Sequence, residues 1–538
     1  MKILRELTRL QHELGYLEDA TLRQVAERMR VPLYRIEGLV SFYPMFRRTP
    51  PPRLHVNVCR DICCRMARDP NASAPLLDQL RTRDDIEIRE VSCLGRCDAA
   101  PALAINGTPV APRTMHDLQE VLPCVEQPAS LSNEPNEKTR RWKCDPYADA
   151  SQRYGTVRSL VEAGTVAATC IERLEQSRLR GMGGAGFPTG RKWELVFQET
   201  ATPKYVICNA DESEPGTFKD RVILDELPHL VIEGMLLAGL TVGAERGIVF
   251  LRHEYGREHQ ALQRALQQAR AAGVLGPNAA NSDQAFDIEV FVSPGGYILG
   301  EETALLEALE DKRGEPRHKP PYPGTHGLWG QPTLINNVET FALATSILHH
   351  GATWWEQQSE GDFSGLKFVS ISGDVVHPGV HEIPLGTTVR ELIRLAGGMP
   401  DGESLKAFLP GGASSNFLTA AHADTPLDFD RMQQAGSMLG TGAVIVLSER
   451  RDLFDMATSL VRFFRNESCG KCLPCRLGTE QATEILQCIQ AGNASSEQLQ
   501  FVEALNDTLQ QTSICGLGQV ALNPLLSLLK HFPDDVPQ

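Results

Sequence analysis

Two features are scarce in this sequence: excess positive charge and long hydrophobic runs. Across 538 residues, 53 Lys and Arg stand against 68 Asp and Glu, which gives a formal net charge of −15. Proteins that coat nucleic acid or bind an anionic membrane surface concentrate Lys and Arg, so neither partner is expected. The most apolar window, residues 230–250, is interrupted by Glu233, Glu245 and Arg246. It therefore falls short of the roughly 20 consecutive apolar residues that a membrane span needs.

An export signal and internal repeats are also missing. The first twenty residues, MKILRELTRLQHELGYLEDA, predict a charged amphipathic helix, whereas a signal peptide has an uninterrupted apolar core. A cytoplasmic location is therefore expected. In that reducing compartment the 14 cysteines are expected to bind metal rather than form disulfides. Eight of them fall into two groups with ligand-like spacing.

Changes in composition along the chain predict a multidomain α/β protein. Prolines at 50–52 end a run of short helices, because proline cannot continue a helix. Alternating runs at 53–59 and 86–93 predict strands, with a helix at 74–83 between them, and the runs KYVICNA, RGIVFLR and FDIEVFVS predict a larger sheet. The expected parts are a helical lead (1–50), a small α/β domain (51–125), a polar linker (126–145), a larger α/β domain (146–366), a compact α+β domain (367–448) and a helical domain (449–538).

The C-terminal cysteine group is SCGKCLPCR, with a fourth thiol forty residues later in SICGLG. Cys469, Cys472 and Cys475 have C-x-x-C-x-x-C spacing, and Cys515 is the distant partner. Three close thiolates and one distant thiolate are typical of 4Fe–4S ligation. Zinc or free thiols remain the alternative, although structural zinc usually takes two C-x-x-C pairs.

The N-terminal cysteine group follows the two predicted strands. Cys59 and Cys64 form a C-x4-C pair, and Cys93 and Cys97 form a C-x3-C pair. Two thiolates for each iron suit a 2Fe–2S cluster. Cys63 could instead pair with Cys59, but we treat it as a bystander thiol. Zinc or unligated cysteines remain alternatives here.

The glycine-rich loop GMGGAGFPTGRKW matches G-x-G-x-x-G at residues 181, 183 and 186. A Rossmann fingerprint needs a strand before the first glycine and a helix at the third. Here the preceding CIERLEQSRLR is helical in period, and Pro188 and Gly190 are expected to oppose a helix after the loop. We therefore predict an anion-binding loop outside a Rossmann domain, with a plain surface turn as the alternative.

Three further blocks carry polar residues at sites where ligands commonly bind. CNADESEPGTFKD (208–220) crowds carboxylates at the end of a predicted strand, a common ligand position in open α/β sheets. A solvated acidic loop or a calcium site would also explain this block. The other two blocks are GGYILGEETALLEAL (295–309) and RHKPPYPGTHGLWGQPTLINNVET (317–340).

In order and spacing, these blocks together resemble the NADH-binding flavoprotein subunit of respiratory complex I. The same module occurs in NAD-reducing hydrogenases and in NAD-dependent molybdenum or tungsten formate dehydrogenases. The N-terminal region, with EGLVSFYPMF, CRDICC and CLGRC, is similar to the thioredoxin-like 2Fe–2S subunit of the same systems. The resemblance implies a thioredoxin-like 2Fe–2S domain, an FMN-binding α/β domain that is not a typical Rossmann fold, a β-grasp-like domain, and a C-terminal helical bundle with the 4Fe–4S cluster.

The resemblance also implies where FMN and NAD(H) bind. The positions that correspond to flavin contacts are Gly181, Gly183, Lys192, Asn209, Asp211, Glu212, Tyr297, Gly300, Glu301, Asn336 and Asn337, with Gly184 and Thr340 completing the cofactor set. Those that correspond to nicotinamide nucleotide contacts are Phe187, Glu214, Glu302, Lys319 and Tyr322. Hydride transfer through FMN needs no general acid or base, so Glu214 and Phe187 are expected only to position the nucleotide.

The chain lacks a substrate site for a second half-reaction, so a partner subunit is implied. Its two redox modules are fused, as in soluble formate dehydrogenases and hydrogenases. The segments FLPGGASSNFLTAAHADTPLDF and RHKPPYPG look closest to the β subunit of the formate enzymes. The implied partner is therefore a catalytic α subunit with molybdopterin, carrying molybdenum or tungsten, and further iron–sulfur clusters. The alternatives are a hydrogenase diaphorase subunit, a fused complex I subunit and, in another class, a metal-stapled scaffold without turnover.

Overall fold

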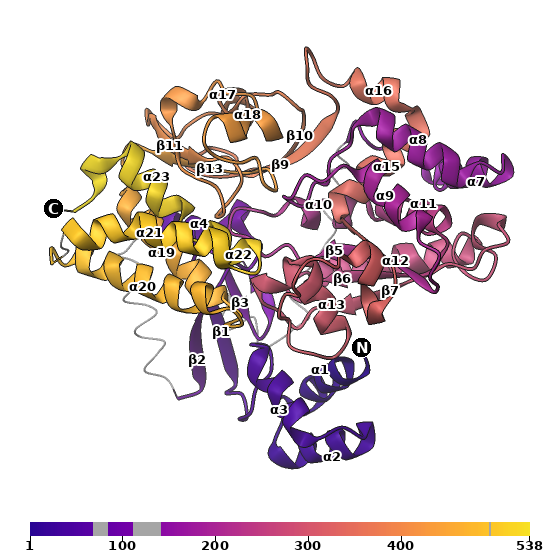
Figure 1. Cartoon of the computed structure of the whole chain (residues 1–538), viewed down its shortest axis with the longest axis horizontal. Helices are drawn as coiled ribbons and strands as arrows, with labels where there is room; N and C mark the ends of the chain where they lie inside the picture. The colour runs from indigo at the N-terminus through magenta and orange to yellow at the C-terminus, as the bar shows by residue number, and fades with distance from the viewer. Residues whose placement is uncertain (68–83, 111–140, 494–495, 538) are drawn as a thin grey trace.

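The computed structural model describes residues 1–67, 84–110, 141–493 and 496–537 (Figure 1). The predicted helix at 74–83, the thiol of Cys124 and most of the predicted linker lie outside these ranges. The helical lead contains α1 (Lys2–Leu14), α2 (Asp19–Met29) and α3 (Leu33–Phe42), as predicted. It packs on the larger α/β domain, where the Leu4 amide donates to the Asp311 carboxylate at 2.9 Å. The Tyr43 hydroxyl donates to the Lys312 carbonyl at 2.6 Å.

The small N-terminal domain is built on a four-stranded sheet in the order β2-β1-β3-β4. Strands β1 and β2 are parallel, while β3 pairs antiparallel with both β1 and β4. Both predicted strands are present, because alternating apolar residues of β1 face the core. The element bounds are β1 (Leu54–Cys59), α4 (Ile62–Ala67), β2 (Ile86–Val91), η1 (Cys97–Ala99), β3 (Leu103–Ile105) and β4 (Thr108–Val110).

The larger α/β domain has a fully parallel sheet in the order β7-β6-β5-β8. The chain runs from β5 outward through β6 to β7 and then returns to β8 on the other side of β5. The strand order therefore reverses between β5 and β8, which is where open α/β sheets bind ligands. The strands are β5 (Lys204–Ala210), β6 (Ala244–Leu251), β7 (Asp287–Val292) and β8 (Thr333–Asn337).

Helices on both sides of this sheet complete the domain (Figure 1). The long helices are α7 (Gly155–Glu162), α8 (Val166–Ser177), α9 (Thr189–Gln198), α10 (Lys219–Glu226), α11 (Pro228–Val242), α12 (Gly256–Ala271), α13 (Glu302–Leu309) and α15 (Val338–His350). The short ones are η2 (Ala150–Gln152), η3 (Ala279–Asn281), η4 (Tyr297–Gly300), α14 (Pro323–His326), η5 (Leu328–Gly330) and α16 (Ala352–Glu356).

The apolar window at 230–250 forms α11 and most of β6. Helix α11 is buried on nearly every face, which explains its apolar composition without a membrane. It packs so closely on α15 that a Cβ added at Gly234 would lie 2.3 Å from the Phe341 carbonyl oxygen. Within the described ranges, no helix has both the length and the apolar character to cross a bilayer.

The α+β domain has a mixed sheet in the order β10-β9-β13-β11-β12, with β9 and β13 parallel at its centre. One face of this sheet has a core of its own, while residues on the other face, such as Phe368 and Ile445, join the core of the larger α/β domain. The bounds are β9 (Leu366–Gly373), β10 (Gly379–Pro384), α17 (Val389–Leu395), β11 (Leu405–Leu409), β12 (Leu418–Thr419), η6 (Ala420–His422), α18 (Phe429–Gln434) and β13 (Ala443–Ser448). The end of the predicted linker lies against this domain, because the amides of Lys143 and Cys144 donate to the Glu382 carboxylate at 2.5 and 2.8 Å.

The C-terminal domain is helical, as predicted. It contains α19 (Leu453–Glu467), α20 (Leu473–Gln490), α21 (Ser496–Thr512), α22 (Gly516–Val520), α23 (Asn523–His531) and η7 (Pro533–Asp535). Figure 1 shows this bundle between the N-terminal sheet and the α+β domain. Contacts of α19 with α4 and of α23 with β12 join it to both.

Candidate functional site

Two asparagines mark the point where the parallel sheet changes direction. Asn209 is the penultimate residue of β5, Asn337 ends β8, and the two are register partners. The Asn209 amide donates to the Gly300 carbonyl of η4 at 2.8 Å. Asn337 caps α15, since its side-chain oxygen accepts from the Glu339 amide at 3.0 Å. These residues form the floor of a ligand site at the carboxyl edge of the sheet.

The glycine loop covers this edge. The Gly181 amide donates to the Phe187 carbonyl at 2.8 Å, and the Met182 amide donates to the Thr340 hydroxyl at 2.9 Å. At Gly183 an added Cβ would lie only 3.1 Å from the Asn337 Cβ. Because Gly183 has no side chain, the loop can approach the end of β8 and the N-terminus of α15, a position that suits a phosphate.

The secondary structure around this loop differs in part from the prediction. Helix α8 precedes it, as predicted, and no strand does, so a Rossmann turn is excluded. The expectation that Pro188 and Gly190 oppose a helix is wrong, because α9 begins at Thr189 with Pro188 as its N-cap. Gly190 is needed for packing: an added Cβ would lie 2.6 Å from the Glu175 amide nitrogen on α8.

Two exposed aromatic rings lie on segments that the resemblance assigns to the nucleotide. Phe187 is 44% exposed and Tyr322 is 61% exposed. Rings of this size are usually buried, so their exposure leaves apolar faces available to a flat ligand. The Lys192 ammonium lies 5.9 Å from the centre of the Phe187 ring and donates to the Ile335 carbonyl at 3.1 Å. Burial lowers the pKa of Lys192.

Three carboxyl groups follow β5, and burial raises the pKa of each to about 7. Asp211 accepts from the hydroxyls of two serines, both at 3.1 Å. Glu212 accepts from the amides of Asp220 and Arg221 in the first turn of α10, at 2.9 and 3.2 Å, and from the Tyr255 hydroxyl at 2.8 Å. Glu214 accepts from the Ser414 amide at 2.8 Å.

The calcium alternative finds no support in the arrangement of these carboxylates. Among the residues that the structure describes, no three His, Cys, Asp or Glu side chains are placed to hold one metal ion. Each carboxylate is instead bound by a different part of the protein. Glu214 accepts from Ser414, whereas Glu212 accepts from two amides and the Tyr255 hydroxyl.

A third group of predicted contacts forms an ion cluster at the start of α13. Lys319 lies 2.9 Å from both Glu301 and Glu302. Glu301 also caps the helix by accepting from the amides of Thr303 and Ala304, both at 2.9 Å. The Lys319 and Glu302 side chains are 27% and 31% exposed, so a ligand can reach them.

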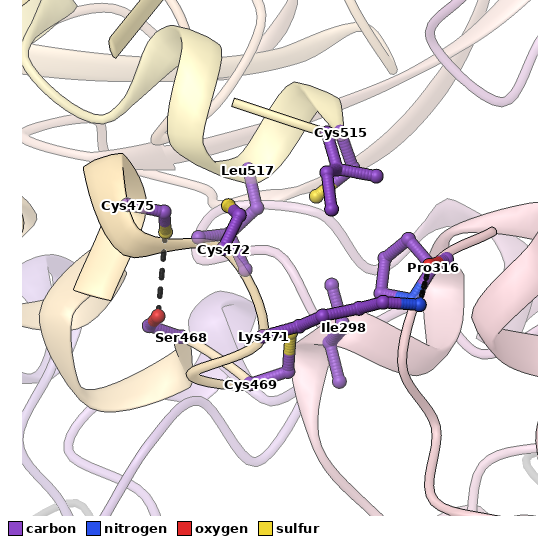
Figure 2. A pocket seen from close by; sticks show the side chains of 10 residues that line it. Ile298, Pro316, Ser468, Cys469, Lys471, Cys472, Cys475, Cys515 and Leu517 are labelled. Carbon is purple, nitrogen blue, oxygen red and sulfur yellow. Dashed lines mark hydrogen bonds between the residues drawn. The ribbon is translucent and has the colours of Figure 1, made fainter. Parts of the chain in front are cut away.

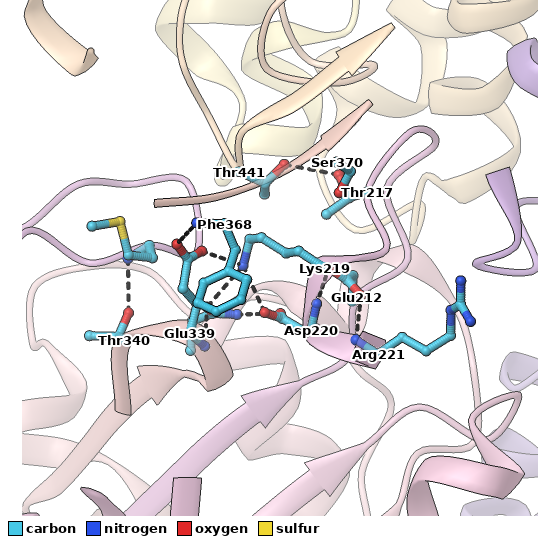
Figure 3. Close-up of polar contacts among 12 residues, drawn as sticks. Glu212, Thr217, Lys219, Asp220, Arg221, Glu339, Thr340, Phe368, Ser370 and Thr441 are labelled. Atoms are coloured by element: carbon cyan, nitrogen blue, oxygen red, sulfur yellow. Dashed lines mark hydrogen bonds and ion pairs between the residues drawn. The ribbon is translucent and has the colours of Figure 1, made fainter. Parts of the chain in front are cut away.

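A buried charge network lies beneath the glycine loop (Figure 3). Glu339, on α15, accepts from Lys219 at 2.9 Å and from Lys367 of β9 at 3.1 Å. Lys219 also lies 2.7 Å from Asp220, and the Asn337 amide donates to the Asp220 carboxylate at 2.5 Å. All four charged side chains are at most 4% exposed. The network therefore joins the α+β domain to the floor of the site.

The predicted 2Fe–2S ligands come together in the N-terminal domain. Cys59 lies within hydrogen-bonding reach of Cys64 and Cys93, and the sulfurs of Cys93 and Cys97 are 3.5 Å apart. Two thiolates on one tetrahedral metal with bonds of about 2.3 Å lie about 3.8 Å apart, so this pair fits one iron. The amides of Gly95 and Ala102 point at the sulfurs of Cys93 and Cys64 at 3.4 and 3.3 Å. Such N–H donors are typical of iron–sulfur sites.

Cys63 lies beside this group but also faces another domain. Its sulfur is 3.3 Å from the Ser372 hydroxyl of β9, and it lies within hydrogen-bonding reach of Cys97. Cys144, Cys170 and Cys208, which have no ligand spacing, are buried, as is usual for cysteines that only pack, whereas Cys488 is half-buried.

The 2Fe–2S loop is bonded directly to the carboxylate loop of the larger domain. The Gly216 amide donates to the Cys97 sulfur at 3.3 Å. Arg252, just after β6, donates to the Glu212 carbonyl at 2.6 Å and also to the Cys93 carbonyl. One guanidinium thus bridges the two loops, although the sequence predicted Arg252 only as the end of the strand run RGIVFLR. Its position directly after a strand is the signal that could have identified it.

The predicted 4Fe–4S ligands surround a pocket (Figure 2). Cys469, Cys472, Cys475 and Cys515 line it together with apolar side chains, and its empty volume is about 270 Å³ including its mouth. The Ser468 hydroxyl lies 3.3 Å from the Cys475 sulfur. Four thiols around one apolar space fit a cuboidal cluster better than four thiols on one ion.

Four protein families match successive parts of the chain. Residues 1–126 match the thioredoxin-like 2Fe–2S ferredoxins, and residues 174–345 match the Nuo51 FMN-binding domain. Residues 368–415 match the SLBB domain, and residues 455–538 match the iron–sulfur binding region of NADH-ubiquinone oxidoreductase F. These matches confirm the predicted order of the folds and the predicted FMN, 2Fe–2S and 4Fe–4S cofactors.

Individual relatives extend the match. The F subunit of NADH-quinone oxidoreductase in Escherichia coli is 41% identical over 368 residues, which cover 68% of this chain and 83% of the relative. The HndC subunit of the NADP-reducing hydrogenase in Solidesulfovibrio fructosivorans is 39% identical over 369 residues, which cover 68% and 75%. The crystal structure of an NAD+-reducing NiFe hydrogenase in its H2-reduced state aligns with a TM-score of 0.87 and 31% identity. That alignment covers 98% of this chain and 91% of the hydrogenase chain.

Proposed function

The chain belongs to the family of NADH-binding FMN and iron–sulfur subunits that includes the F subunit of NADH-quinone oxidoreductase, and we propose that it is the diaphorase subunit of an NAD-dependent formate dehydrogenase. Family membership makes it a flavin and iron–sulfur oxidoreductase subunit that uses NAD(H), FMN, a 2Fe–2S cluster and a 4Fe–4S cluster. It carries thioredoxin-like and flavoprotein modules on one chain. The proposal concerns the residues that hold each cofactor and the partner that supplies the electrons.

In this proposal the flavin occupies the carboxyl edge of the parallel sheet. Gly183 and its neighbours approach the phosphate, while Asn209 and Asn337 bind from the strand ends. A flavin exchanges electron pairs with NAD(H) and single electrons with iron–sulfur clusters, which explains why these cofactors share one chain. Phe187 and Glu214 orient the nicotinamide nucleotide by contact and hydrogen bonding. No side chain needs to move a proton for hydride transfer.

One observation supports the electron-transfer role most strongly: η4 borders two proposed cofactor sites. Asn209 of the proposed flavin site donates to the Gly300 carbonyl at the end of η4. Ile298, in the same turn, lines the pocket of the four C-terminal cysteines. Across the carboxylate loop, the Gly216 amide contacts a thiol of the N-terminal cysteine group. A scaffold without turnover would not need its two cysteine groups beside one nucleotide site.

The proposal of a formate-oxidising partner subunit rests on sequence resemblance. The segments 408–429 and 317–324 resemble the β subunit of formate enzymes, and both contact carboxylates of the proposed nucleotide site. Ser414 contacts Glu214, and Lys319 contacts Glu302. The proposed partner is an α subunit with molybdopterin and further iron–sulfur clusters, and electrons then run from formate to NAD+.

A hydrogenase partner is the second candidate, because the fold of an NAD+-reducing NiFe hydrogenase subunit matches 98% of this chain. The two candidates differ in metal and substrate. The tagged chain can be purified from its native host together with its partners, followed by metal analysis and assays of NAD+ reduction. Formate-dependent reduction with molybdenum or tungsten supports the proposal. Hydrogen-dependent reduction with nickel would replace it.

A further inference from the structure

Glu467 stands at the junction of three loops that serve different cofactors. It is the last residue of α19 and lies two residues before Cys469. The next residue, Ser468, contacts the Cys475 sulfur through its hydroxyl at 3.3 Å. Any shift of the Glu467 backbone therefore moves the start of the C-terminal cysteine loop.

One oxygen of the Glu467 carboxylate holds the turn beside the flavin site. This oxygen, Oε2, accepts from the Tyr297 amide at 2.8 Å. The Tyr297 ring also packs on α19, with its centre 5.0 Å from that of Phe463. Because Tyr297 begins η4, both its backbone and its ring tie this turn to the helix that precedes the C-terminal cysteines.

The other oxygen of the carboxylate holds the N-terminal cysteine loop. This oxygen, Oε1, accepts from the Ser92 hydroxyl, although Ser92 lies 375 residues away in sequence. Ser92 directly precedes Cys93, whose carbonyl accepts from Arg252. The loop is thus tied to α19 on one side and to the larger α/β domain on the other.

We propose that Glu467 is a positioning residue that fixes the positions of the two cysteine loops and of η4 relative to one another. One carboxylate oxygen binds Ser92 of the N-terminal cysteine loop, and the other binds Tyr297 of η4. The backbone of Glu467 continues directly into the C-terminal cysteine loop. Hydrogen bonds to a half-buried carboxylate are stronger than neutral ones, so one side chain can set three relative positions. The inference rests on the proposed function, because the loops matter together only if electrons pass between their cofactors.

Two substitutions separate positioning from charge. In Glu467→Gln the amide oxygen can accept from Tyr297, and the amide NH2 can donate to Ser92, because a hydroxyl both donates and accepts. The negative charge is lost, but both bonds are kept. In Glu467→Ala the charge and both bonds are lost. Ser92→Ala removes only the bond to the N-terminal loop.

The experiment uses the full chain loaded with FMN and both clusters. Electron paramagnetic resonance of dithionite-reduced protein reports the surroundings of each cluster, and rapid freezing after mixing with NADH gives the rate at which the 4Fe–4S cluster is reduced. We expect this rate to fall at least ~10-fold in Glu467→Ala, because NADH reduces the cluster only after hydride transfer to the flavin, and a misplacement of about 1 Å between reacting groups can cost ~100-fold in rate. Glu467→Gln should stay within ~3-fold of the unchanged chain. Ser92→Ala should change the spectrum of the 2Fe–2S cluster alone.

The matched control is Glu480→Ala, which removes a 54% exposed carboxylate from α20 that lies 3.8 Å from Arg465. Its spectra and rates should match those of the unchanged chain. The proposal is overturned if Glu467→Ala behaves like this control, or if Glu467→Gln is as impaired as Glu467→Ala. If Glu467→Ala fails to assemble its clusters, Ser92→Ala decides instead: an unchanged 2Fe–2S spectrum in that variant overturns the proposal. Failure of NADH to reduce the unchanged chain would contradict the proposed function instead, while the dithionite spectra would still test Glu467.

Discussion

Binding of NAD+ should depend on the ionisation of Glu214. Burial raises the pKa of this carboxyl to about 7, so it is mostly neutral at pH 6 and mostly ionised at pH 8. The hydroxyls and carboxamide of a nicotinamide nucleotide donate hydrogen bonds, and an ionised carboxylate accepts them more strongly. The affinity for NAD+ should therefore rise with pH, because NAD+ binds more tightly when Glu214 is ionised.

The size of the effect follows from the pKa. With a pKa of about 7, the ionised fraction rises from about 9% at pH 6 to about 91% at pH 8, so the dissociation constant should fall ~10-fold. Glu214→Gln removes the charge, and a hydrogen bond to a charged group contributes about 1.5–3 kcal/mol. The variant should therefore bind NAD+ ~10- to ~100-fold more weakly at pH 8, with little dependence on pH.

Isothermal titration of the oxidised protein with NAD+ at pH 6, 7 and 8 measures this directly. The matched control is Glu233→Gln, because burial also raises the pKa of Glu233 to about 7 but this residue lies on α11, where it contacts Tyr147 and Val157. The control should keep the pH dependence of the unchanged chain. If Glu214→Gln keeps it as well, Asp211 or Glu212 titrates in its place and the reasoning is refuted.

Three further outcomes test other parts of the site. Gly183→Ala should weaken FMN binding at least ~10-fold, since the new methyl group crowds the end of β8. Fluorescence titration of the flavin-free protein measures this affinity, and an unchanged affinity would contradict the proposed contact of the glycine loop with FMN. Cys63→Ala should keep the 2Fe–2S resonance signal and Cys64→Ala should lose it; the opposite pattern would reassign the ligand. Glu339→Gln, which leaves two buried ammonium groups short of a partner, should lower the free energy of unfolding by about 3–5 kcal/mol. The exposed control Asp424→Asn removes a surface ion pair with Arg390 and should leave the melting temperature nearly unchanged. Equal losses of melting temperature in the two variants would contradict the role of the buried network.

Features that depend on neighbouring residues were predictable from the sequence. KYVICNA became β5 with the same bounds, Lys204–Ala210, because a short apolar run can be buried on both faces of a parallel sheet. The close C-x-x-C-x-x-C spacing places three thiols on one turn, so only the distant Cys515 depended on tertiary structure. The structure brings it to the same pocket.

Features that join different domains were not predictable. The contacts of Arg252 with Cys93, of Ser414 with Glu214 and of Glu467 with Ser92 connect residues 159, 200 and 375 positions apart. No local pattern specifies such pairs, because each depends on how whole domains pack. The prediction for the segment after the glycine loop failed for a related reason. A glycine within a helix usually weakens it, but here close packing of two helices requires one.

The central claim is that this chain carries electrons between NAD(H) and its iron–sulfur clusters through FMN. The most direct test adds NADH without oxygen to the purified, partner-free chain and follows flavin absorbance and low-temperature electron paramagnetic resonance together. The account predicts bleaching of the flavin and the appearance of a reduced-cluster signal with NADH alone. A colourless chain without flavin and iron, or a fully loaded chain that NADH leaves oxidised, would contradict it.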